Sequence, residues 1–479
     1  MQSYPIDDGS PTSSEPGISE DAVYDILGVG FGPSNIALAV AVDEQNAQMP
    51  ERPLRAGFLE RKEVFGWHEG MLLESATMQI SFLKDLVTMR NPRSRFTFLE
   101  YLSACGRLVP FINHKTLFPL RTEFHDYLEW VADQFGELVR YGSEVVDVRP
   151  VDTEGVVGHL DVVSHEAGDL VTRRTRNLVV ASGIVPSLPP GVERSDRLWH
   201  SAEFLTRLRH IDGAPSVCTV VGAGQSGAEV AAHLHENFPD AAVHVVLSRY
   251  GYSPADDSPF VNRIFDPEAV DEFYFAPPPV QQKFFEYHAN TNYSVVDTDL
   301  IEDLYRRLYR ETVRGRRRLH MHRMTALRQV ETSADRVRLH LEHLSTGGHR
   351  ELDSDLVVFA TGYRPMDPLT VLGTTADLCK RDATGRLRVQ RDHRVVTVGS
   401  AECGIYLQGG TEHTHGLSSS LLSTAAVRSG EIVRSIVESL AGPGSMPSTR
   451  AGATERQERP SPCTSLTSTE HRIRPGRST

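Results

Sequence analysis

The sequence predicts an α/β fold in which one doubly wound unit is inserted into another. Two segments, near residues 23–45 and 216–236, each read as a short apolar strand, a glycine-rich turn and a helix. Apolar runs at 177–183 and 355–363 have the length and composition of buried parallel strands. The second strand–turn–helix segment falls between pieces of the first unit, which predicts the insertion.

The first unit begins with an apolar run over 23–27. A helical apolar pattern follows, after a turn made of Gly28, Gly30, Gly32 and Pro33. Pro33 stands where a GxGxxG loop has its third glycine, and the first turn of a helix tolerates proline. A second strand over 54–59 ends in Glu60, whose carboxylate suits the hydroxyls of a ribose without a 2′-phosphate. The first unit is therefore a Rossmann-like unit predicted to bind FAD.

The second unit has a strand over 217–221 and a helix that begins near Gln225. The loop between them matches GxGxxG and reads Gly222-Ala223-Gly224-Gln225-Ser226-Gly227. Backbone amides at such a helix N-terminus bind a pyrophosphate. The next strand, over 242–248, ends just before Arg249, whose guanidinium can pair with a 2′-phosphate. This unit is therefore predicted to bind NADPH, and the alternative for Arg249 is a solvated loop charge.

Composition excludes several classes of protein. The chain of 479 residues carries 50 basic and 63 acidic residues, and its net charge of −13 argues against a general nucleic-acid binder. The five cysteines are scattered and form no CxxC pair, which favours a reduced, cytoplasmic compartment and argues against a flavin disulfide reductase. No apolar run approaches the length of about 18 residues that a membrane-spanning helix needs.

Both ends of the chain are predicted to be disordered. Residues 1–21 and 442–479 are rich in Ser, Pro and charged side chains and have too little apolar surface to offset the entropy of ordering. The N-terminal segment also lacks the apolar stretch of a signal peptide.

Beyond these general motifs, seven segments follow one another in a very specific order: GVGFGPSNIALA, FGWHEGMLLESATMQISFLKDLVTMRNPRSRFTF, GAGQSGAE, SPFVNRIF, NTNYSVVD, FATGYRP and HTHGLSSSLLS. With them the chain resembles the flavin-dependent N-hydroxylating monooxygenases, specifically the ornithine N5-monooxygenases of hydroxamate siderophore synthesis. The resemblance runs from about Tyr24 to Ile436.

The resemblance, together with the glycine turns, assigns site residues. Those for FAD are Gly28, Gly30, Gly32, Pro33, Glu60, Trp67, His68, Gln79, Val145, Ser420, Leu421 and Leu422. Those for NADPH are Gly222, Ala223, Gly224, Gln225, Ser226, Arg249, Asn292, Tyr293 and Ser294. Those for the amino-acid substrate are Lys84, Asn262, Arg263, Ile264, Phe265, Asn292 and Ser423. Lys84 would bind the substrate carboxylate.

The resemblance also implies a division of the chain. An FAD-binding domain would occupy 22–210 and, together with a substrate cap, 331–441. An NADPH-binding domain over 211–330 would be inserted between these parts and would carry a small substrate-binding region over 255–300.

The implied activity is the NADPH- and O2-dependent hydroxylation of L-ornithine at N5 through a flavin C4a-hydroperoxide. No residue is assigned as a general acid or base, and the resemblance suggests a homo-oligomer, a dimer or a tetramer. No metal is expected, because the pairs His320/His322 and His413/His415 have no third ligand in sequence.

Several alternatives stay open. A lysine N6-monooxygenase resembles this chain over the glycine loops, and a carbon-oxidising monooxygenase, which would act on ketones, has the same two-domain plan. A non-catalytic flavin-binding redox sensor would also carry the two loops. Taken without the resemblance, Lys84 reads as a lysine that snorkels from a helix, and Asn262 and Asn292 read as turn residues. The basic run from Arg314 to Arg318 reads as a solvated helix end.

Overall fold

The computed structural model describes residues 22–211, 213–256, 258–292, 294–333 and 335–441. The chain divides into two units, Met1–Val437 and Glu438–Thr479. Of the second unit only the end of the last helix, 438–441, is described. The tails predicted over 1–21 and 442–479 lie outside the described residues.

The first sheet has five parallel strands, in the order β20 (Gly404–Leu407), β8 (Asn177–Val180), β2 (Ile26–Val29), β3 (Ala56–Leu59) and β4 (Val139–Arg140). All residues of the first four strands are buried, as continuous apolar runs predict for a sheet covered on both faces. Helix α1 (Pro33–Gln48) follows β2 directly, with Pro33 at its first turn as predicted. The predicted strand over 23–27 is divided into two strands at Asp25. The carboxylate of Asp25 accepts hydrogen bonds from Arg55 N and from the side chain of Arg176.

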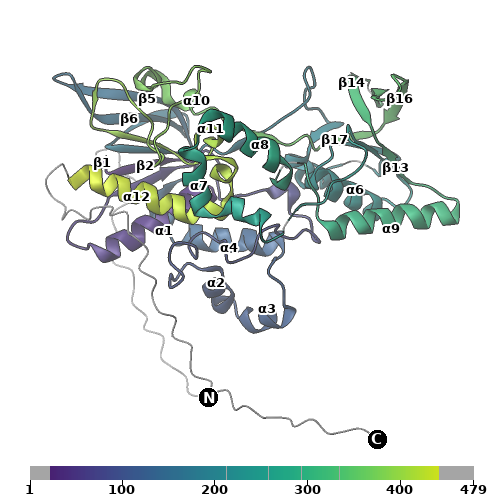
Figure 1. Ribbon diagram of the computed structural model, residues 1–479, viewed down its shortest axis with the longest axis horizontal. Coiled ribbons are helices and arrows are strands. Elements are labelled where there is room, and N and C mark those ends of the chain that lie inside the picture. The colour runs from purple at the N-terminus through teal and green to yellow at the C-terminus, as the bar shows by residue number, and fades with distance from the viewer. Residues whose placement is uncertain (1–21, 212, 257, 293, 334, 442–479) are drawn as a thin grey trace, which may run out of the picture. The chain divides into compact units, whose positions relative to one another are not determined.

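The second sheet is also parallel, in the order β10 (Leu198–His200), β17 (Leu356–Phe359), β11 (Val217–Val221), β12 (Ala242–Val246) and β13 (Leu319–His322). Helix α6 (Gln225–Asn237) begins at the predicted residue, and α9 (Thr298–Arg314) packs against α6 and β13 (Figure 1). Because β10 and β17 lie outside 211–330, that predicted range is too short to contain the sheet. Neither β10 nor β17 has a glycine loop beside it. No pattern in the sequence therefore assigned these strands to the second unit.

Three smaller sheets complete the strands. A mixed sheet joins β1 (Val23–Tyr24), β7 (Asp169–Thr175), β6 (Val156–Glu166), β5 (Ser143–Thr153) and β19 (Ser400–Ala401). An antiparallel sheet joins β14 (Thr325–Thr332), β15 (Val337–His343) and β16 (His349–Ser354). The third is a pair, β9 (Ile184–Pro186) with β18 (Tyr363–Pro365), and it lies in the two chain segments that run between the large sheets.

Along the chain, most of the remaining helices lie between the strands given above. They are α2 (Phe98–Ala104), α3 (Leu108–His114), α4 (Arg121–Asp133), α5 (Phe204–Leu208), α7 (Pro267–Tyr274), α8 (Pro278–Asn292), α10 (Leu369–Leu372), α11 (Glu412–His415) and α12 (Ala425–Ala441). Helix α7 packs against α11, which brings the predicted substrate region to the C-terminal part of the chain (Figure 1). Among the described residues, no helix is both long and apolar enough to cross a lipid bilayer.

Three histidines form a stack on β12 and β13. The ring of His244 lies between His320, at 4.5 Å and 11°, and His322, at 5.2 Å and 18°. His244 Nδ1 and His322 Nε2 share a hydrogen bond of 2.9 Å. The sequence did not reveal His244 as a neighbour of the His320/His322 pair, because the contact is made across strands.

Acid is expected to destabilise this sheet. Burial and then the neighbouring imidazoles lower the pKa of His244 to about 3, and burial followed by Arg350 lowers the pKa of His322 to about 4. An unfolded histidine has a pKa of about 6.5, so between roughly pH 6.5 and pH 4 the unfolded chain binds protons that the folded chain does not. The free energy of unfolding therefore falls as the pH falls through this window, and thermal melts across it measure the loss.

The variant His244→Gln is expected to give a shallower dependence of Tm on pH than the parent. His349→Gln, which changes an exposed histidine at the start of β16, is the control and should keep the parental slope. An unchanged slope in His244→Gln would show that the stack does not govern acid stability.

Candidate functional site

Two glycines of the first loop differ in the space that lies beside them. Gly30 has φ +83°, and a Cβ on it would lie 2.6 Å from the carbonyl oxygen of Ala181. Gly32 is the N-cap of α1, and a Cβ there would meet nothing within 4 Å. The glycine at 30 is therefore required by the fold, whereas the space beside Gly32 at the helix N-terminus fits a pyrophosphate.

A network of buried polar side chains holds the first glycine loop in place. Asn35 Nδ2 donates to the carbonyl oxygens of Val29 and Gly30, at 3.2 and 2.7 Å. Gln408 Nε2 donates to Asn35 Oδ1 at 3.2 Å, and Arg428 Nε donates to Gln408 Oε1 at 3.1 Å. The chain therefore ties its first loop to residues almost 400 positions later.

The same network reaches the predicted flavin residues of the C-terminal region. Arg428 donates to the carbonyl oxygen of Ser419, next to Ser420. Ser420 Oγ accepts from Gly410 N at 3.3 Å, and Leu421 and Leu422 follow it half-buried. The structure thus brings Ser419, the neighbour of Ser420, into the network that holds the first glycine loop. Sequence reasoning missed Asn35, Gln408 and Arg428; the one signal was a cation, Arg428, within an apolar helical pattern.

Glu60 lies at the end of β3, beside the same loop. Its Oε2 accepts from Phe31 N at 2.7 Å, and its Oε1 accepts from Lys62 N at 2.9 Å. The carboxylate is therefore fixed next to the loop at the end of β3, the position in the fold that the sequence predicts for Glu60.

Four other predicted flavin residues differ in exposure. Trp67 is half-buried, and its ring packs edge-on against His68, at 4.7 Å. His68, which has φ +52°, and Gln79 are both exposed. Val145 lies buried within β5. The first three thus offer accessible surface to a ligand, whereas Val145 contributes mainly to the core.

The second glycine loop is packed tightly at two positions. Gly222 has φ +149°, and a Cβ on it would lie 2.2 Å from the carbonyl oxygen of Ala360. A Cβ on Gly227 would lie 3.0 Å from the oxygen of Gly222, so this glycine permits the close approach of α6 to its strand. Gly224 is the N-cap of α6 and leaves the helix N-terminus without a side-chain cap. Ala223, Gln225 and Ser226 are half-buried around it.

Arg249 lies next to this loop. Its Nη1 donates to the carbonyl oxygen of Ser294 at 3.1 Å. The Cα of Ser294 in turn would lie 3.5 Å from a Cβ on Gly224. Three segments predicted to face NADPH are therefore together. The side chain of Arg249 is half-buried, and a backbone contact at the surface orients it. Tyr293 lies outside the described residues.

Lys84 is the candidate for the carboxylate of a substrate. It is half-buried in a segment of turns rather than on a helix, so its reading as a snorkelling helical lysine is wrong. Its Nζ lies 5.8 Å from the ring centroid of Phe265, and no carboxylate among the described residues forms an ion pair with it. A half-buried cation that pairs with no carboxylate of the described residues is available to a negatively charged ligand group.

Asp85 fixes the backbone that carries Lys84. Asp85 is 1% exposed, and its Oδ1 accepts from the amides of Val87 and Thr88 at 2.9 and 2.6 Å. Its Oδ2 accepts from Thr88 Oγ1 and from Phe98 N, the first residue of α2, at 2.9 and 2.8 Å. The Asp85 carboxylate therefore joins the turn that follows it to the first residue of α2. The sequence did not indicate this role.

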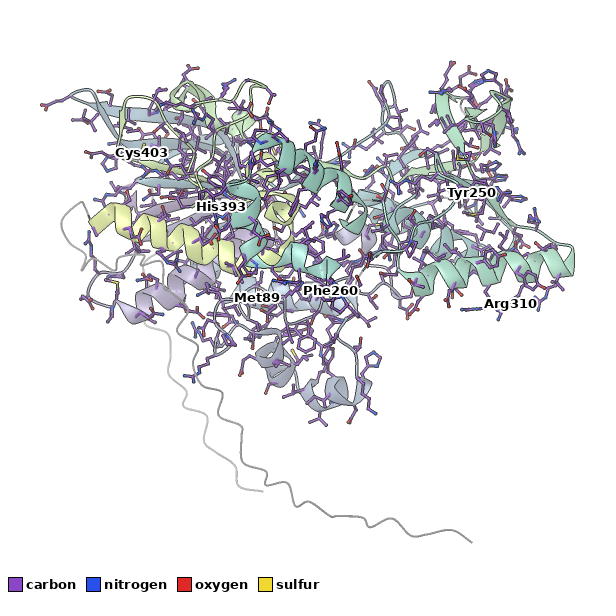
Figure 2. The ribbon with its side chains drawn as sticks, in the orientation of Figure 1. Met89, Tyr250, Phe260, Arg310, His393 and Cys403 are labelled. Carbon is purple, nitrogen blue, oxygen red and sulfur yellow. The ribbon has the colours of Figure 1, made fainter. Side chains whose placement is uncertain are left out.

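The other predicted substrate residues are only partly brought together. Asn262 to Phe265 form the 3-10 helix η4 (Val261–Phe265), which contacts η6 (Leu417–Ser420). Ile264 is buried, whereas Arg263 is exposed and pairs with Asp266 at 3.4 Å. Phe260, labelled in Figure 2, precedes η4 and is 89% exposed. No described contact links Arg263 to Lys84.

Ser423 is a buried hydroxyl without a partner. It is 4% exposed, and its Oγ has no hydrogen bond to any described residue. An unpaired hydroxyl is costly in the interior, so a polar ligand group beside it would be stabilising. The side chain of Asn292 lies outside the described residues.

The comparisons with known proteins agree with this geometry. The family model for L-lysine 6-monooxygenase/L-ornithine 5-monooxygenase matches residues 22–365. The L-ornithine N(5)-oxygenase of Arthrobotrys oligospora is 41% identical, over 87% of this chain and 88% of the relative.

Two solved structures are similar over almost all of the described chain. The ornithine N-hydroxylase of Kutzneria sp. 744, solved with reduced FAD, NADP+ and L-ornithine, has a TM-score of 0.84 and 46% identity, over 87% of this chain and 99% of that one. The L-lysine 6-monooxygenase of Pseudomonas syringae has a TM-score of 0.77 and 32% identity, over 87% of this chain and 100% of that one.

Proposed function

Because the chain belongs to the L-lysine 6-monooxygenase/L-ornithine 5-monooxygenase family, we propose that it hydroxylates the side-chain amine of L-ornithine at N5, with FAD as cofactor and NADPH and O2 as co-substrates. The observation that carries the proposal is Lys84. Its ammonium is half-buried, faces Phe265 and has no counter-ion among the described residues, as a site for an amino-acid carboxylate requires.

FAD would be held by the first glycine loop. The open N-terminus of α1 at Gly32 would bind the pyrophosphate, and Glu60 would accept from the ribose hydroxyls. Trp67, His68 and Gln79 have exposed or half-buried side chains that would contact the flavin. Bound FAD, after reduction by NADPH, would supply the chemistry that activates O2.

NADPH would be held by the second loop. The N-terminus of α6 at Gly224 would bind its pyrophosphate, and Arg249 would pair with its 2′-phosphate. An arginine at this strand end supports NADPH over NADH, because only NADPH carries the second anion.

The zwitterionic end of ornithine would be bound between Lys84 and Ser423. Lys84 would pair with the carboxylate, and the unpartnered Ser423 Oγ would hydrogen-bond a polar group of the substrate. The chain would thus fix the head group and leave the side-chain amine free to extend to the flavin.

The amine must be neutral to react. An alkylammonium has a pKa of about 10.4 in water, and exclusion of water from a closed site favours loss of its proton. We assign no residue as general base. The chain's contribution is therefore orientation of the amine and exclusion of water rather than proton abstraction by a named side chain.

The preference for ornithine over lysine is supported by the relatives. The ornithine hydroxylase from Kutzneria is 46% identical and the lysine monooxygenase from Pseudomonas syringae is 32% identical. We further propose that the product enters hydroxamate siderophore synthesis, that the protein acts in the cytoplasm and that it forms a homo-oligomer. Exposed aromatic residues of the predicted substrate region, Phe260, Phe275 and Tyr287, are suited to an interface between copies.

A substrate comparison tests the function. The purified, FAD-loaded protein is incubated with NADPH and O2 and with L-ornithine, L-lysine or a simple ketone, and the hydroxylamine product is measured beside NADPH oxidation. Product from ornithine alone is expected. Product mainly from lysine would assign the lysine N6 activity, and absence of NADPH oxidation with every substrate would favour a flavin-binding sensor.

A further inference from the structure

Two short segments that carry predicted substrate residues are each followed directly by a longer helix. The 3-10 helix η4, which includes Asn262 to Phe265, continues into α7 through Asp266. The 3-10 helix η7 (Leu422–Thr424), which includes Ser423, continues into α12. A displacement of either helix would therefore displace the predicted substrate residues that precede it.

The guanidinium of Arg391 joins these two helices. Its Nε donates to Asp271 Oδ1 on α7. Its Nη1 and Nη2 donate to the two carboxylate oxygens of Glu431 on α12, both at 2.9 Å. Two parallel hydrogen bonds hold an arginine and a carboxylate in one relative orientation. Because the guanidinium is planar and rigid, the pair with Glu431 also sets the direction in which Nε meets Asp271.

The α12 end of this link is supported by two buried histidines. His393, labelled in Figure 2, is 3% exposed, and its Nε2 shares a hydrogen bond of 3.1 Å with Glu431 Oε2. His415 Nε2 donates to the carbonyl oxygen of Arg391 at 3.2 Å. Burial acts to raise the pKa of Glu431, but the hydrogen bonds from His393 and Arg391 outweigh it and lower this pKa to about 2. The pair of Arg391 with Glu431 is therefore ionised at neutral pH.

A small cavity lies between α7 and α12 beside this link. It is lined by Pro267 and Val270 of α7 and by Val427 and Glu431 of α12, together with Arg391. Because the side chains of the two helices leave space here, close packing alone does not fix the distance between them. The hydrogen bonds of Arg391 cross the same gap and fix it.

The α7 end of the link is exposed but lies close to the substrate region. The side chain of Asp271 is 54% exposed. In the preceding helix η4, the ring centroid of Phe265 lies 5.8 Å from Nζ of Lys84, the candidate partner of the substrate carboxylate. A shift of α7 would therefore change the surroundings of Lys84, although Asp271 itself can be replaced without disturbing the core.

We propose that Arg391 is a positioning residue for the amino-acid substrate, which sets the spacing of η4 and η7 by joining Asp271 to Glu431. This inference rests on the proposed function, in which Ser423 of η7 hydrogen-bonds the substrate. The link lies in neither glycine loop. Its loss should therefore weaken the binding of ornithine and leave the reduction of flavin by NADPH unchanged.

The variant Asp271→Ala tests the proposal in the FAD-loaded enzyme. Alanine is a strong helix former, so α7 should be retained, and the pair of Arg391 with Glu431 is left intact. The KM of ornithine is expected to rise about threefold to fivefold, as the loss of a partly exposed ion pair allows. The kcat at saturating ornithine, the KM of NADPH and the anaerobic rate of flavin reduction should stay within about 1.5-fold of the parent.

Arg391→Gln breaks both halves of the link and is expected to raise the KM of ornithine about tenfold or more. When Asp271→Ala is added to Arg391→Gln, no further rise is expected, because the partner of Asp271 is already absent. Arg391→Lys restores the charge without the planar fork and should recover only part of the loss. The control is Glu272→Ala, which removes the next, exposed carboxylate of α7 and should behave as the parent.

Several results would overturn the inference. They are a KM of ornithine within about 1.5-fold of the parent in Asp271→Ala, a KM of NADPH that rises in step with that of ornithine, or a loss confined to Tm. Asp271→Ala alone decides the matter if Arg391→Gln does not fold. If the parent itself forms no hydroxylated product from ornithine, the proposed function fails and this inference fails with it. If the parent forms the product and the variants match it, only this inference fails.

Discussion

Replacing Lys84 by alanine is expected to raise the KM of ornithine about 100-fold, which corresponds to about 2.7 kcal/mol, while NADPH oxidation continues. The ammonium of Lys84 is the half-buried cation proposed to pair with the substrate carboxylate. Flavin reduction does not need this contact. Electrons from NADPH should therefore reach O2 without hydroxylation, and the measurement is the ratio of hydrogen peroxide to hydroxylated product at each ornithine concentration.

Two variants control the Lys84 experiment. Lys84→Met keeps most of the unbranched side chain against Phe265 and removes the charge, so it should behave like the alanine variant if charge is the cause. Lys283→Ala removes an exposed lysine from α8 in the predicted substrate region and should have no effect. An unchanged KM in Lys84→Ala would remove Lys84 from the substrate site.

Replacing Arg249 by alanine is expected to reduce kcat/KM for NADPH about 30-fold, which corresponds to about 2 kcal/mol, and to leave the value for NADH within about threefold. The guanidinium is proposed to bind the 2′-phosphate, which NADH lacks. Its Nη1 is already oriented by the carbonyl oxygen of Ser294, so little entropy is lost when the phosphate binds. Steady-state rates with both nucleotides measure the change in preference.

The control for Arg249 is Arg310→Ala. Arg310 is exposed on α9 (Figure 2), so its removal should leave both nucleotides unaffected. Equal losses with NADPH and NADH in Arg249→Ala would mean that Arg249 supports the loop and does not read the 2′-phosphate.

The two glycine loops were predictable because they are local patterns. A strand, a glycine turn and a helix are contiguous in the chain, and their positions at Gly30 and Gly224 follow from that order. The strand end at Glu60 follows in the same way. The centre of each parallel sheet, β2 with β3 and β11 with β12, therefore needed only the strand patterns of the sequence.

Long-range contacts were not predictable from these patterns. Strands β10, β17 and β20 are short and carry no glycine loop that assigns them to a sheet. Arg428 reaches the first loop through Gln408, and Asp297 reaches Gln225, across distances in sequence that no periodicity encodes. The role of Lys84 was ambiguous for the same reason. The backbone that carries Lys84 is held by a hydrogen bond from an amide of α2 to Asp85, and no pattern in the sequence indicates this contact.

A single turnover tests the central claim most directly. The FAD-loaded protein is reduced anaerobically with one equivalent of NADPH and is then mixed with O2 and L-ornithine. We expect bleaching of the flavin by NADPH and formation of about one N5-hydroxyornithine per flavin. Failure of NADPH to reduce the flavin, or reduction followed only by hydrogen peroxide at saturating ornithine, would contradict it.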